Sequence, residues 1–229
     1  MRRDPAKLRS SEDREVFFVS EPRFEISPLR GMVDVPLKIR LTGIQPGDLV
    51  TVRSTIADGI WTAESSFEVA ADGVIDLEEQ APVSGSYSTV DTMGLIWSAS
   101  LQASQESLAS LSNLEPFAIT FDAVSGGNVL ASASVLRDQI PDGVQREVVR
   151  KDGLLGTLFV PPSAGPHPAV MLVSGSGGGL DERLASLFAA HGIAGFSLAY
   201  FNYEALPKAL VNIPLEYFET GSNSCRLTP

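Results

Sequence analysis

One stretch constrains the fold of this chain more than any other: residues 168–201, where two apolar runs flank a glycine-rich turn and a helix-like segment. The first run, at 168–174, is almost continuous, which is typical of a strand buried on both faces of a sheet. Four apolar side chains then recur on one helical stripe: Leu180, Leu184, Leu187 and Phe188. A second apolar run follows at 195–201. The order strand, turn, helix, strand predicts the βαβ unit of a parallel sheet, so we expect an α/β domain to begin near residue 145.

The first half of the chain has a different periodicity, in which apolar and polar residues alternate. In the segment 34–43 the apolar members are Val35, Leu37, Ile39 and Leu41. This period of two predicts a strand with one buried and one wet face. Further candidate strands, separated by turns, lie at 49–57, 60–70, 73–78, 116–124 and 129–136. Short strands at this spacing, with no convincing amphipathic helix between them, predict an all-β, immunoglobulin-like sandwich of two antiparallel sheets over residues 17–136.

Composition excludes several classes of partner. The 229 residues include 28 acidic and 17 basic side chains, a formal charge of −11, which opposes binding to nucleic acid or to an anionic membrane. The chain starts with a mixed-charge segment, and no later window approaches the roughly 20 apolar residues of a membrane span. We therefore expect a cytoplasmic protein. A single cysteine, Cys225, rules out an internal disulfide framework and a multi-cysteine metal site, and it fits a reducing compartment.

The glycine-rich turn GSGGG at 175–179 allows several interpretations. A dinucleotide fingerprint needs glycine where Leu180 stands, and no Gly-Lys-Ser/Thr follows to make a phosphate-binding P-loop. A nucleophile elbow around Ser176 needs glycine where Ser174 stands. Two interpretations remain open. The turn is either an oxyanion-binding loop after an early strand of an α/β-hydrolase, or a tight strand-to-helix turn without a ligand.

Three motifs carry a resemblance to a known family: MGLIWS at 93–98, GSGGGL at 175–180 and LAYFNYEALPK at 198–208. Together with their surroundings, from about residue 17 to 219, they resemble the acyl-CoA thioesterase and bile acid-CoA:amino acid N-acyltransferase family. The resemblance implies an amino-terminal β-sandwich followed by the opening of an α/β-hydrolase domain. It also implies an acyl-CoA substrate, no metal or redox cofactor, and hydrolysis of the thioester or transfer of its acyl group to an amino acid. The main-chain donors of the oxyanion hole would come from Gly175, Ser176 and Gly177.

The resemblance also implies the organisation of the chain. We expect four segments: a flexible N-terminus at 1–16, the β-sandwich at 17–136, a linker at 137–144 and an incomplete α/β-hydrolase domain at 145–229. In the family, the nucleophile, an acidic residue and a histidine follow the segment equivalent to LEYFE at 215–219. No Gly-x-Ser-x-Gly or Gly-x-Cys-x-Gly occurs in the 229 residues, and the polar ending at 220–229 lacks helical periodicity. We therefore expect an amino-terminal fragment that contains no catalytic residue and is inactive alone.

Other residues with chemical potential are better explained without catalysis. His191 precedes Gly192 at the expected helix end, which suits a capping role. His167 lies between two prolines in a loop and is expected to face solvent, and Cys225 has no histidine close in sequence to activate it. Two acidic residues open the expected helix and complement its dipole: Asp181 and Glu182. The two tryptophans are expected in the sandwich core or at a domain interface: Trp61 and Trp97.

Two alternatives to a thioesterase or acyltransferase remain open from the residues alone. One is a non-catalytic protein that binds a partner through its β-sandwich. The other is a hydrolase of oxygen esters with the same fold. The preferred acyl chain, the choice between hydrolysis and amine transfer, a serine or cysteine nucleophile, and the oligomeric state also stay open.

Overall fold

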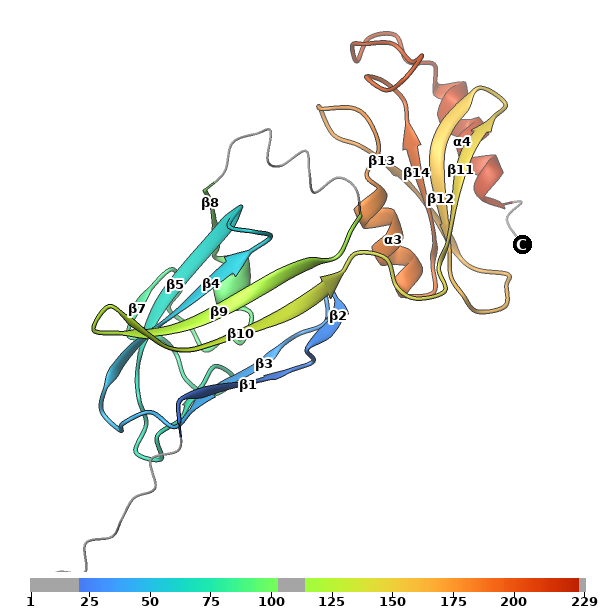
Figure 1. Ribbon diagram of the computed structural model, residues 1–229. Coiled ribbons are helices and arrows are strands. Elements are labelled where there is room, and N and C mark those ends of the chain that lie inside the picture. The colour runs from blue at the N-terminus through green and yellow to red at the C-terminus, as the bar shows by residue number, and fades with distance from the viewer. Residues whose placement is uncertain (1–20, 103–113, 227–229) are drawn as a thin grey trace, which may run out of the picture.

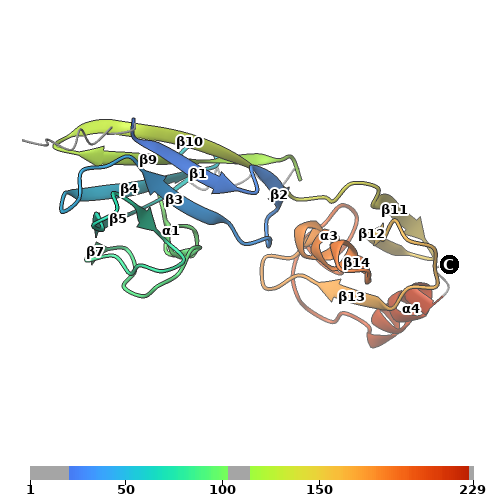
Figure 2. The ribbon, with the colours of Figure 1, turned by 90° about the horizontal axis from the view of Figure 1, so that it is seen from below.

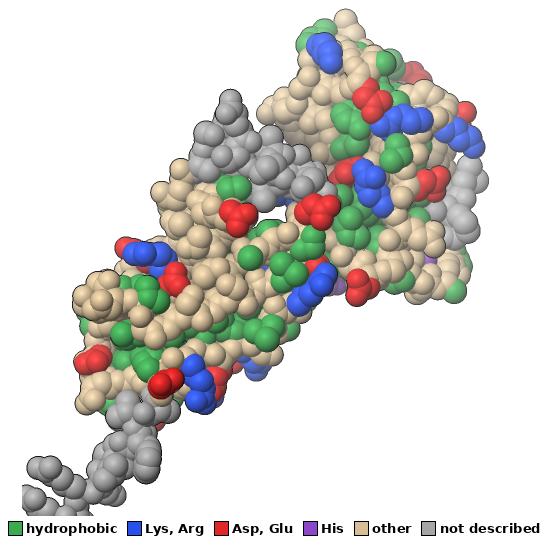
Figure 3. Space-filling view, viewed as in Figure 1, with side chains coloured by type: hydrophobic (Ala, Val, Ile, Leu, Met, Phe, Trp, Pro, Cys, Tyr) green, Lys and Arg blue, Asp and Glu red, His purple; other side chains and the backbone are tan. Residues whose placement is uncertain are grey.

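The computed structural model describes residues 21–102 and 114–226, in two regions that meet at a narrow junction (Figures 1 and 3). The expected flexible segment 1–16 and the first residues of the expected sandwich, 17–20, lie outside the described residues. The structure is mostly β-sheet with few helices. We call residues 21–138 the sandwich region and residues 145–226 the C-terminal region. The division into domains at 137–144 stays a prediction.

The sandwich region contains two sheets. Its elements, in chain order, are β1 Arg23–Ser27, β2 Arg30–Met32, β3 Lys38–Thr42, β4 Leu49–Ile56, β5 Trp61–Glu68, β6 Ile75–Asp76, β7 Ser84–Gly85, α1 Gly94–Trp97, β8 Ser100–Leu101, β9 Phe117–Ser125 and β10 Asn128–Asp138. One sheet has the order β1-β3-β6, and the other has the order β2-β10-β9-β4-β5-β7, with β8 also paired to β5. Every pair is antiparallel except β2 with β10. The expectation of purely antiparallel sheets is therefore wrong at this one pair.

The two sheets bury their facing sides in one apolar core. Strand β3 contributes Ile39 and Leu41, and Leu37 lies directly before it; all three are fully buried, which confirms the alternation predicted from the sequence. The larger sheet contributes Val52 and Phe121, among others, to the same core cluster. Val35 does not continue the pattern, since it is 39% exposed. It lies in the connection before β3 rather than in the strand.

The two tryptophans have different environments. Trp61 is partly buried against the sandwich core, as expected. The expectation for Trp97 is wrong, because its side chain is 61% exposed and its indole N–H donates to Asp91 Oδ2 at 2.8 Å. Trp97 ends the short helix α1, and the start of that helix at Gly94 lies so close to Tyr87 that a Cβ would be 2.3 Å from the Tyr87 ring.

The C-terminal region is one sheet with a helix on each face. Its elements are β11 Gln145–Lys151, β12 Leu154–Val160, β13 Ala169–Val173, α3 Glu182–Ala190, β14 Ala194–Ala199 and α4 Leu215–Arg226. The strand order is β11-β12-β14-β13, with β13 and β14 parallel and the other pairs antiparallel. The expected βαβ unit is confirmed. Figure 2 shows α3 and α4 on opposite sides of the sheet.

The burial of the two parallel strands differs. All six residues of β14 are buried, as its apolar run predicts. Strand β13 is not buried on both faces, because it lies at the sheet edge in the described chain and Val173 is 48% exposed. Continuous hydrophobicity therefore indicates a fully buried strand correctly at β14, whereas β13, with the same pattern, is only partly enclosed in the described chain.

Helix α3 packs on the sheet through small residues. Its buried residues are Ala185, Ser186 and Ala189, whereas Leu184 is 40% exposed, so the predicted leucine stripe is wrong at that position. The reason is the close approach of α3 to β14. A Cβ at Gly195 would lie 2.3 Å from the Ala185 carbonyl oxygen, a gap that excludes larger side chains.

Helix α4 extends through the polar segment that we expected to lack helical structure. The helix continues to Arg226, so that expectation is wrong. Gly221 is buried, and a Cβ there would lie within 3 Å of both Leu198 and Met171. Thr220 Oγ1 donates to the Glu216 carbonyl at 2.9 Å, one turn earlier. Among residues 220–224 the buried residue is a glycine rather than an apolar side chain, which is why hydrophobic periodicity gave no signal there.

Candidate functional site

The glycine-rich loop at 174–181 connects the third strand of the C-terminal region, β13, to its first helix, α3. Gly178 and Gly179 have φ values of +70° and +77°, which side chains rarely tolerate. A Cβ at Gly178 would also lie 2.6 Å from the Phe201 carbonyl oxygen. These two glycines are therefore required by the turn itself.

Residues 197–202, in the last part of β14 and just after it, clamp the loop through four hydrogen bonds. Gly179 N–H donates to the Phe201 carbonyl at 3.1 Å, and Asn202 Nδ2 donates to the Gly177 carbonyl at 2.9 Å. On the strand side, the Tyr200 hydroxyl donates to the Ser174 carbonyl at 2.9 Å. At the helix end, Asp181 N–H donates to Ser197 Oγ at 2.8 Å. The motif at 198–208 thus holds the loop, a role that its sequence alone did not reveal.

Three successive N–H groups of the loop remain available. Within the described part of the chain, the N–H groups of Gly175, Ser176 and Gly177 have no hydrogen-bond acceptor. All three residues are exposed. A Cβ at Gly175 or at Gly177 would meet no described atom within 4 Å, so neither glycine is required by internal packing. The structure brings the three sequence-predicted donors together on one accessible backbone segment.

A cavity of about 470 Å³ opens beside these donors. Its lining residues come from β11, the glycine loop, the start of α3 and two other loops: Leu114, Arg146, Ser174, Gly175, Leu180, Asp181, Glu182, Arg183 and Tyr203. Asp181 caps the helix by accepting from Leu184 N–H at 3.2 Å. Glu182 accepts two hydrogen bonds from Arg146, at 2.7 and 3.0 Å. Both acidic groups are thus engaged in structure, as expected, and the helix N-terminus adds positive potential to the cavity.

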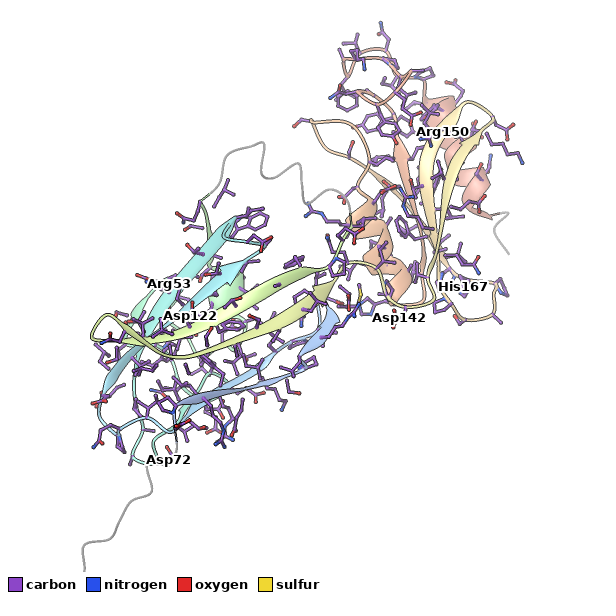
Figure 4. All side chains as sticks on the ribbon, in the orientation of Figure 1. Arg53, Asp72, Asp122, Asp142, Arg150 and His167 are labelled. Carbon is purple, nitrogen blue, oxygen red and sulfur yellow. The ribbon has the colours of Figure 1, made fainter. Side chains whose placement is uncertain are left out.

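The turn that clamps the loop is itself tied to β11. Arg150, which Figure 4 labels, donates from Nε to Glu204 Oε2 at 3.1 Å. Its guanidinium also contacts the other carboxylate oxygen of Glu204. Its guanidinium lies 5.6 Å from the centre of the Tyr203 ring. Hydrogen bonding to Arg150 lowers the pKa of the Glu204 carboxyl. Glu204 therefore stays charged and ties the segment after β14 to β11. The same segment contacts the glycine loop through Asn202.

The other candidates lie away from the loop. His167 precedes β13, at the end of the strand opposite the glycine loop, and it is partly buried rather than facing solvent (Figure 4). His191 caps the far end of α3, and its Nε2 lies 2.6 Å from Asp34 Oδ2 of the sandwich region. Cys225 lies in the last turn of α4. The structure brings none of these three residues to the loop.

Two further features are absent from the part of the chain that the structure describes. No three His, Cys, Asp or Glu residues among those described are grouped so as to hold a metal ion. None of the helices in the described ranges has the length and apolar character needed to cross a membrane.

Comparison with known proteins decides the family. Residues 34–151 match the model of the acyl-CoA thioester hydrolase/BAAT N-terminal region. The chain belongs to this family. It is 35% identical over 198 residues to the human protein named acyl-coenzyme A thioesterase 1, an alignment that covers 83% of this chain and 47% of the relative. It is also 35% identical over 209 residues to the mouse acyl-coenzyme A amino acid N-acyltransferase 1, covering 86% and 50%.

A third relative in this family qualifies the expected location. The human acyl-coenzyme A thioesterase 2, named as mitochondrial, is 35% identical over 198 residues, which cover 83% of this chain and 41% of that protein. The chain thus spans about half the length, or less, of these relatives. A cytoplasmic location stays a prediction.

Proposed function

We propose that this chain forms the acyl-binding half of an acyl-CoA thioesterase or an acyl-CoA:amino acid N-acyltransferase, and that its glycine-rich loop stabilises the oxyanion. One observation carries the proposal: the free N–H groups of Gly175, Ser176 and Gly177. They lie in the loop between the third strand and the first helix of a partly parallel sheet. In α/β-hydrolases the corresponding loop contributes an oxyanion donor. The names of the relatives supply the substrate class.

The proposed fold follows the same reasoning. The sandwich, at 17–136, is immunoglobulin-like, and residues 145–229 form the opening of an α/β-hydrolase sheet, with a linker at 137–144. The parallel pair β13 and β14, with α3 between them, supports the second assignment.

The proposed reaction passes through a covalent intermediate. A serine or cysteine attacks the thioester carbonyl carbon, and the electron pair of the C=O bond moves to oxygen. Loop N–H groups at about 2.7–3.1 Å stabilise that oxyanion. The intermediate collapses as the C–S bond breaks, and CoA leaves as the thiol after it takes a proton. Water or the amine of an amino acid then attacks the acyl-enzyme, and the nucleophile is released.

The 229 residues contain no Gly-x-Ser-x-Gly or Gly-x-Cys-x-Gly, so another segment must supply the nucleophile in this proposal. We therefore expect the chain alone to release no thiol from acyl-CoA. An oxygen-ester hydrolase of the same fold is tested by comparing an acyl-CoA with the oxygen ester of the same acyl group. The thioester is expected to react faster.

A chimera tests the loop directly. Residues 34–219 replace the matching segment of human acyl-coenzyme A thioesterase 1, and thiol release from acyl-CoA is measured. Gly177→Val should lower kcat by roughly 10²–10³-fold, the loss typical of an oxyanion donor, because the branched side chain blocks approach of the substrate to the N–H. The melting temperature should not change, since the added Cβ meets no described atom within 4 Å. Gly177→Ala is the graded control, with a smaller loss. An unchanged rate in the valine variant would remove the loop from the site.

A further inference from the structure

Three buried polar atoms have no hydrogen-bond partner among the described residues: the Tyr87 hydroxyl, Arg137 Nη1 and Ser174 Oγ. Buried polar groups are nearly always paired, because an unpaired one lowers the free energy of unfolding, so each exception needs an explanation. Two of the three belong to the sandwich region. Ser174 belongs to the C-terminal region, where it follows β13 directly and precedes Gly175. Its unpaired hydroxyl therefore stands next to the candidate oxyanion donors.

Buried serine hydroxyls elsewhere in the C-terminal region do have partners. Ser186 Oγ donates to the Gln139 carbonyl at 2.7 Å. Ser197 Oγ accepts from Asp181 N–H at 2.8 Å. A serine hydroxyl can rotate, and it can both donate and accept, so it usually finds a partner. Internal packing accounts for Ser186 and Ser197, but it gives no reason for a hydroxyl at position 174.

The location of Ser174 offers a reason. The residue lines the cavity of about 470 Å³ beside the glycine loop. Its carbonyl accepts from the Tyr200 hydroxyl at 2.9 Å, which holds the backbone at this point. The residue as a whole is partly exposed, although its Oγ is buried. Serine side chains occupy three staggered positions about χ1, so a rotation of about 120° moves the hydroxyl to another side of the residue.

We propose that Ser174 is a side-chain donor to the oxyanion. When negative charge forms on the thioester oxygen at the glycine loop, the Ser174 hydroxyl turns into the cavity and donates to that oxygen beside the main-chain N–H groups. This inference rests on the proposed function. Serine side chains act as oxyanion donors together with backbone N–H groups in acyl transfer. The hydroxyl is unpaired before the charge forms and paired afterwards, so its hydrogen bond stabilises the transition state and not the free protein.

The surroundings of Ser174 favour a donor over a nucleophile. A nucleophilic serine needs a base within hydrogen-bond reach. Neither histidine of the described chain is close, because His167 precedes β13 at the opposite end of that strand and His191 caps the far end of α3. Ser174 therefore keeps its proton throughout, and no covalent bond to its oxygen forms or breaks.

The first test measures stability in the whole 229-residue chain. Ser174→Ala removes an unpaired buried hydroxyl, so the melting temperature of the C-terminal region should stay unchanged or rise. The matched control is Ser186→Ala, which should lower that temperature because the Gln139 carbonyl loses its donor. Amide exchange in β14 follows both variants. A loss of stability in Ser174→Ala would show that the hydroxyl has a structural partner, and it would overturn the inference.

The second test measures anion binding by the same chain. The probe is hexylphosphonate, whose negatively charged oxygens stand in for the oxyanion, and it should shift the amide signals of Gly175, Ser176 and Gly177. Ser174→Ala should weaken its affinity roughly tenfold or more, the loss expected for a hydrogen bond to a charged group. Ser174→Thr keeps a hydroxyl and should bind almost as the natural chain does, whereas Ser174→Val has the same shape without one and should bind weakly. Ser186→Ala should bind as the natural chain does. Equal affinities of the threonine and valine variants, or no shift of the three amide signals, would contradict the proposal.

The third test measures thiol release by the chimera. Ser174→Ala and Ser174→Val should lower kcat by about 10–10²-fold with KM unchanged, less than the loss of a preorganised donor because this hydroxyl must first rotate. Ser174→Thr should retain most of the rate, and Ser186→Ala should retain all of it. The two proposals fail separately. A large loss in Gly177→Val with an unchanged rate in Ser174→Ala would exclude Ser174 alone, whereas an unchanged rate in Gly177→Val would exclude the oxyanion role of the loop itself.

Discussion

The sandwich region and the C-terminal region differ in how completely they enclose their apolar residues. In the sandwich region, two sheets face each other across a single cluster of 20 buried apolar residues, counted among those described. In the C-terminal region, one sheet separates two clusters of four buried residues each, again within the described chain, and one of these clusters includes Leu114 of the sandwich region. Large apolar side chains are exposed in both regions, among them Trp97 and Val129 in the sandwich region and Val173 and Leu215 in the C-terminal region, so the two regions differ in the size of the core that they enclose.

This difference shows that a strand can have a strongly apolar sequence and still be only partly covered by neighbouring strands and helices. Strand β13 pairs only with β14 in the described chain, so its other edge has unpaired backbone groups. Unpaired edges of apolar strands are sites of association with other chains. The stability of the C-terminal region therefore depends more on contacts outside itself than the stability of the sandwich does.

The largest effect is expected from a matched pair of phenylalanine-to-alanine substitutions, one in each region. Phe121→Ala removes a fully buried ring from the centre of the sandwich and should lower the free energy of unfolding by about 3–5 kcal/mol. Phe196→Ala in β14 should cost less than about 3 kcal/mol, because its smaller cluster is bordered by partly buried side chains that can collapse into the space. Hydrogen exchange of strand amides measures both values. Equal losses would show that the C-terminal region is as well enclosed as the sandwich.

Two neighbouring glycines test how the site depends on the C-terminal region. Gly178→Ala should destabilise that region by more than about 1 kcal/mol, because its φ is +70° and a Cβ would meet the Phe201 carbonyl at 2.6 Å. Gly177→Ala should leave stability unchanged, since no described atom lies within 4 Å of its added Cβ. Amide exchange in β14 measures the difference. If both variants were equally stable, the clamp by residues 201–202 would not hold the loop.

Local sequence patterns predicted the elements that are defined by residues close together in the sequence. Alternation identified β3 and β4, flanking turns identified β5, and the strand, turn, helix, strand order identified β13, α3 and β14. Strand β2 had no such signal, because it has only three residues and pairs in parallel with β10. Its position depends on contacts distant in sequence, such as the two hydrogen bonds from Arg30 to Asp138 at 2.8 and 2.9 Å. The buried guanidinium of Arg137 also donates to the Met32 and Val35 carbonyls.

The candidate site likewise has one part that the sequence could predict and another part that it could not. The position of the loop could be read from the glycine pattern, whereas the choice of Gly175, Ser176 and Gly177 came from the family resemblance, and their chemical role stays a proposal. The clamp by Asn202 could not, because its φ of +49° and its contact with Gly177 arise only when β14 pairs with β13. The cavity of about 250 Å³ where the two regions meet combines residues from five separate segments, so no local pattern could indicate it.

Tyr87 tests how completely the sandwich region encloses its core. Its ring is 5% exposed, and its buried hydroxyl has no hydrogen-bond partner among the described residues. Burial, helped by the charge of Asp91, raises the pKa of Tyr87 from its ordinary value of 10.0 to about 12. Tyr87→Phe removes an unsatisfied polar group, so at neutral pH the free energy of unfolding should stay unchanged or rise by about 1 kcal/mol.

The same tyrosine gives the sandwich a pH dependence with a definite sign. A raised pKa favours the neutral phenol in the folded state, so its contribution to stability is complete below pH 10.0 and is lost as the pH rises toward about 12. Both tryptophans lie in the sandwich region, so denaturation followed by tryptophan fluorescence reports this region. Between about pH 9 and pH 11 the natural chain should lose more stability than Tyr87→Phe. Parallel losses in the two proteins would contradict the burial of this hydroxyl.

The smallest effect is expected at the junction between the regions. His191 Nε2 and Asp34 Oδ2 are only 2.6 Å apart, but their side chains are 63% and 29% exposed. Water and salt screen a pair of this kind, and exposed pairs contribute about 0–1 kcal/mol. Asp34→Asn should therefore change the unfolding free energy of either region by less than about 1 kcal/mol, and less still at high salt. Fluorescence follows the sandwich and amide exchange in β14 follows the C-terminal region. If one substitution at this exposed contact destabilised both regions together, they would unfold as a single cooperative unit, and the weaker enclosure of the C-terminal region would be compensated by the sandwich beside it.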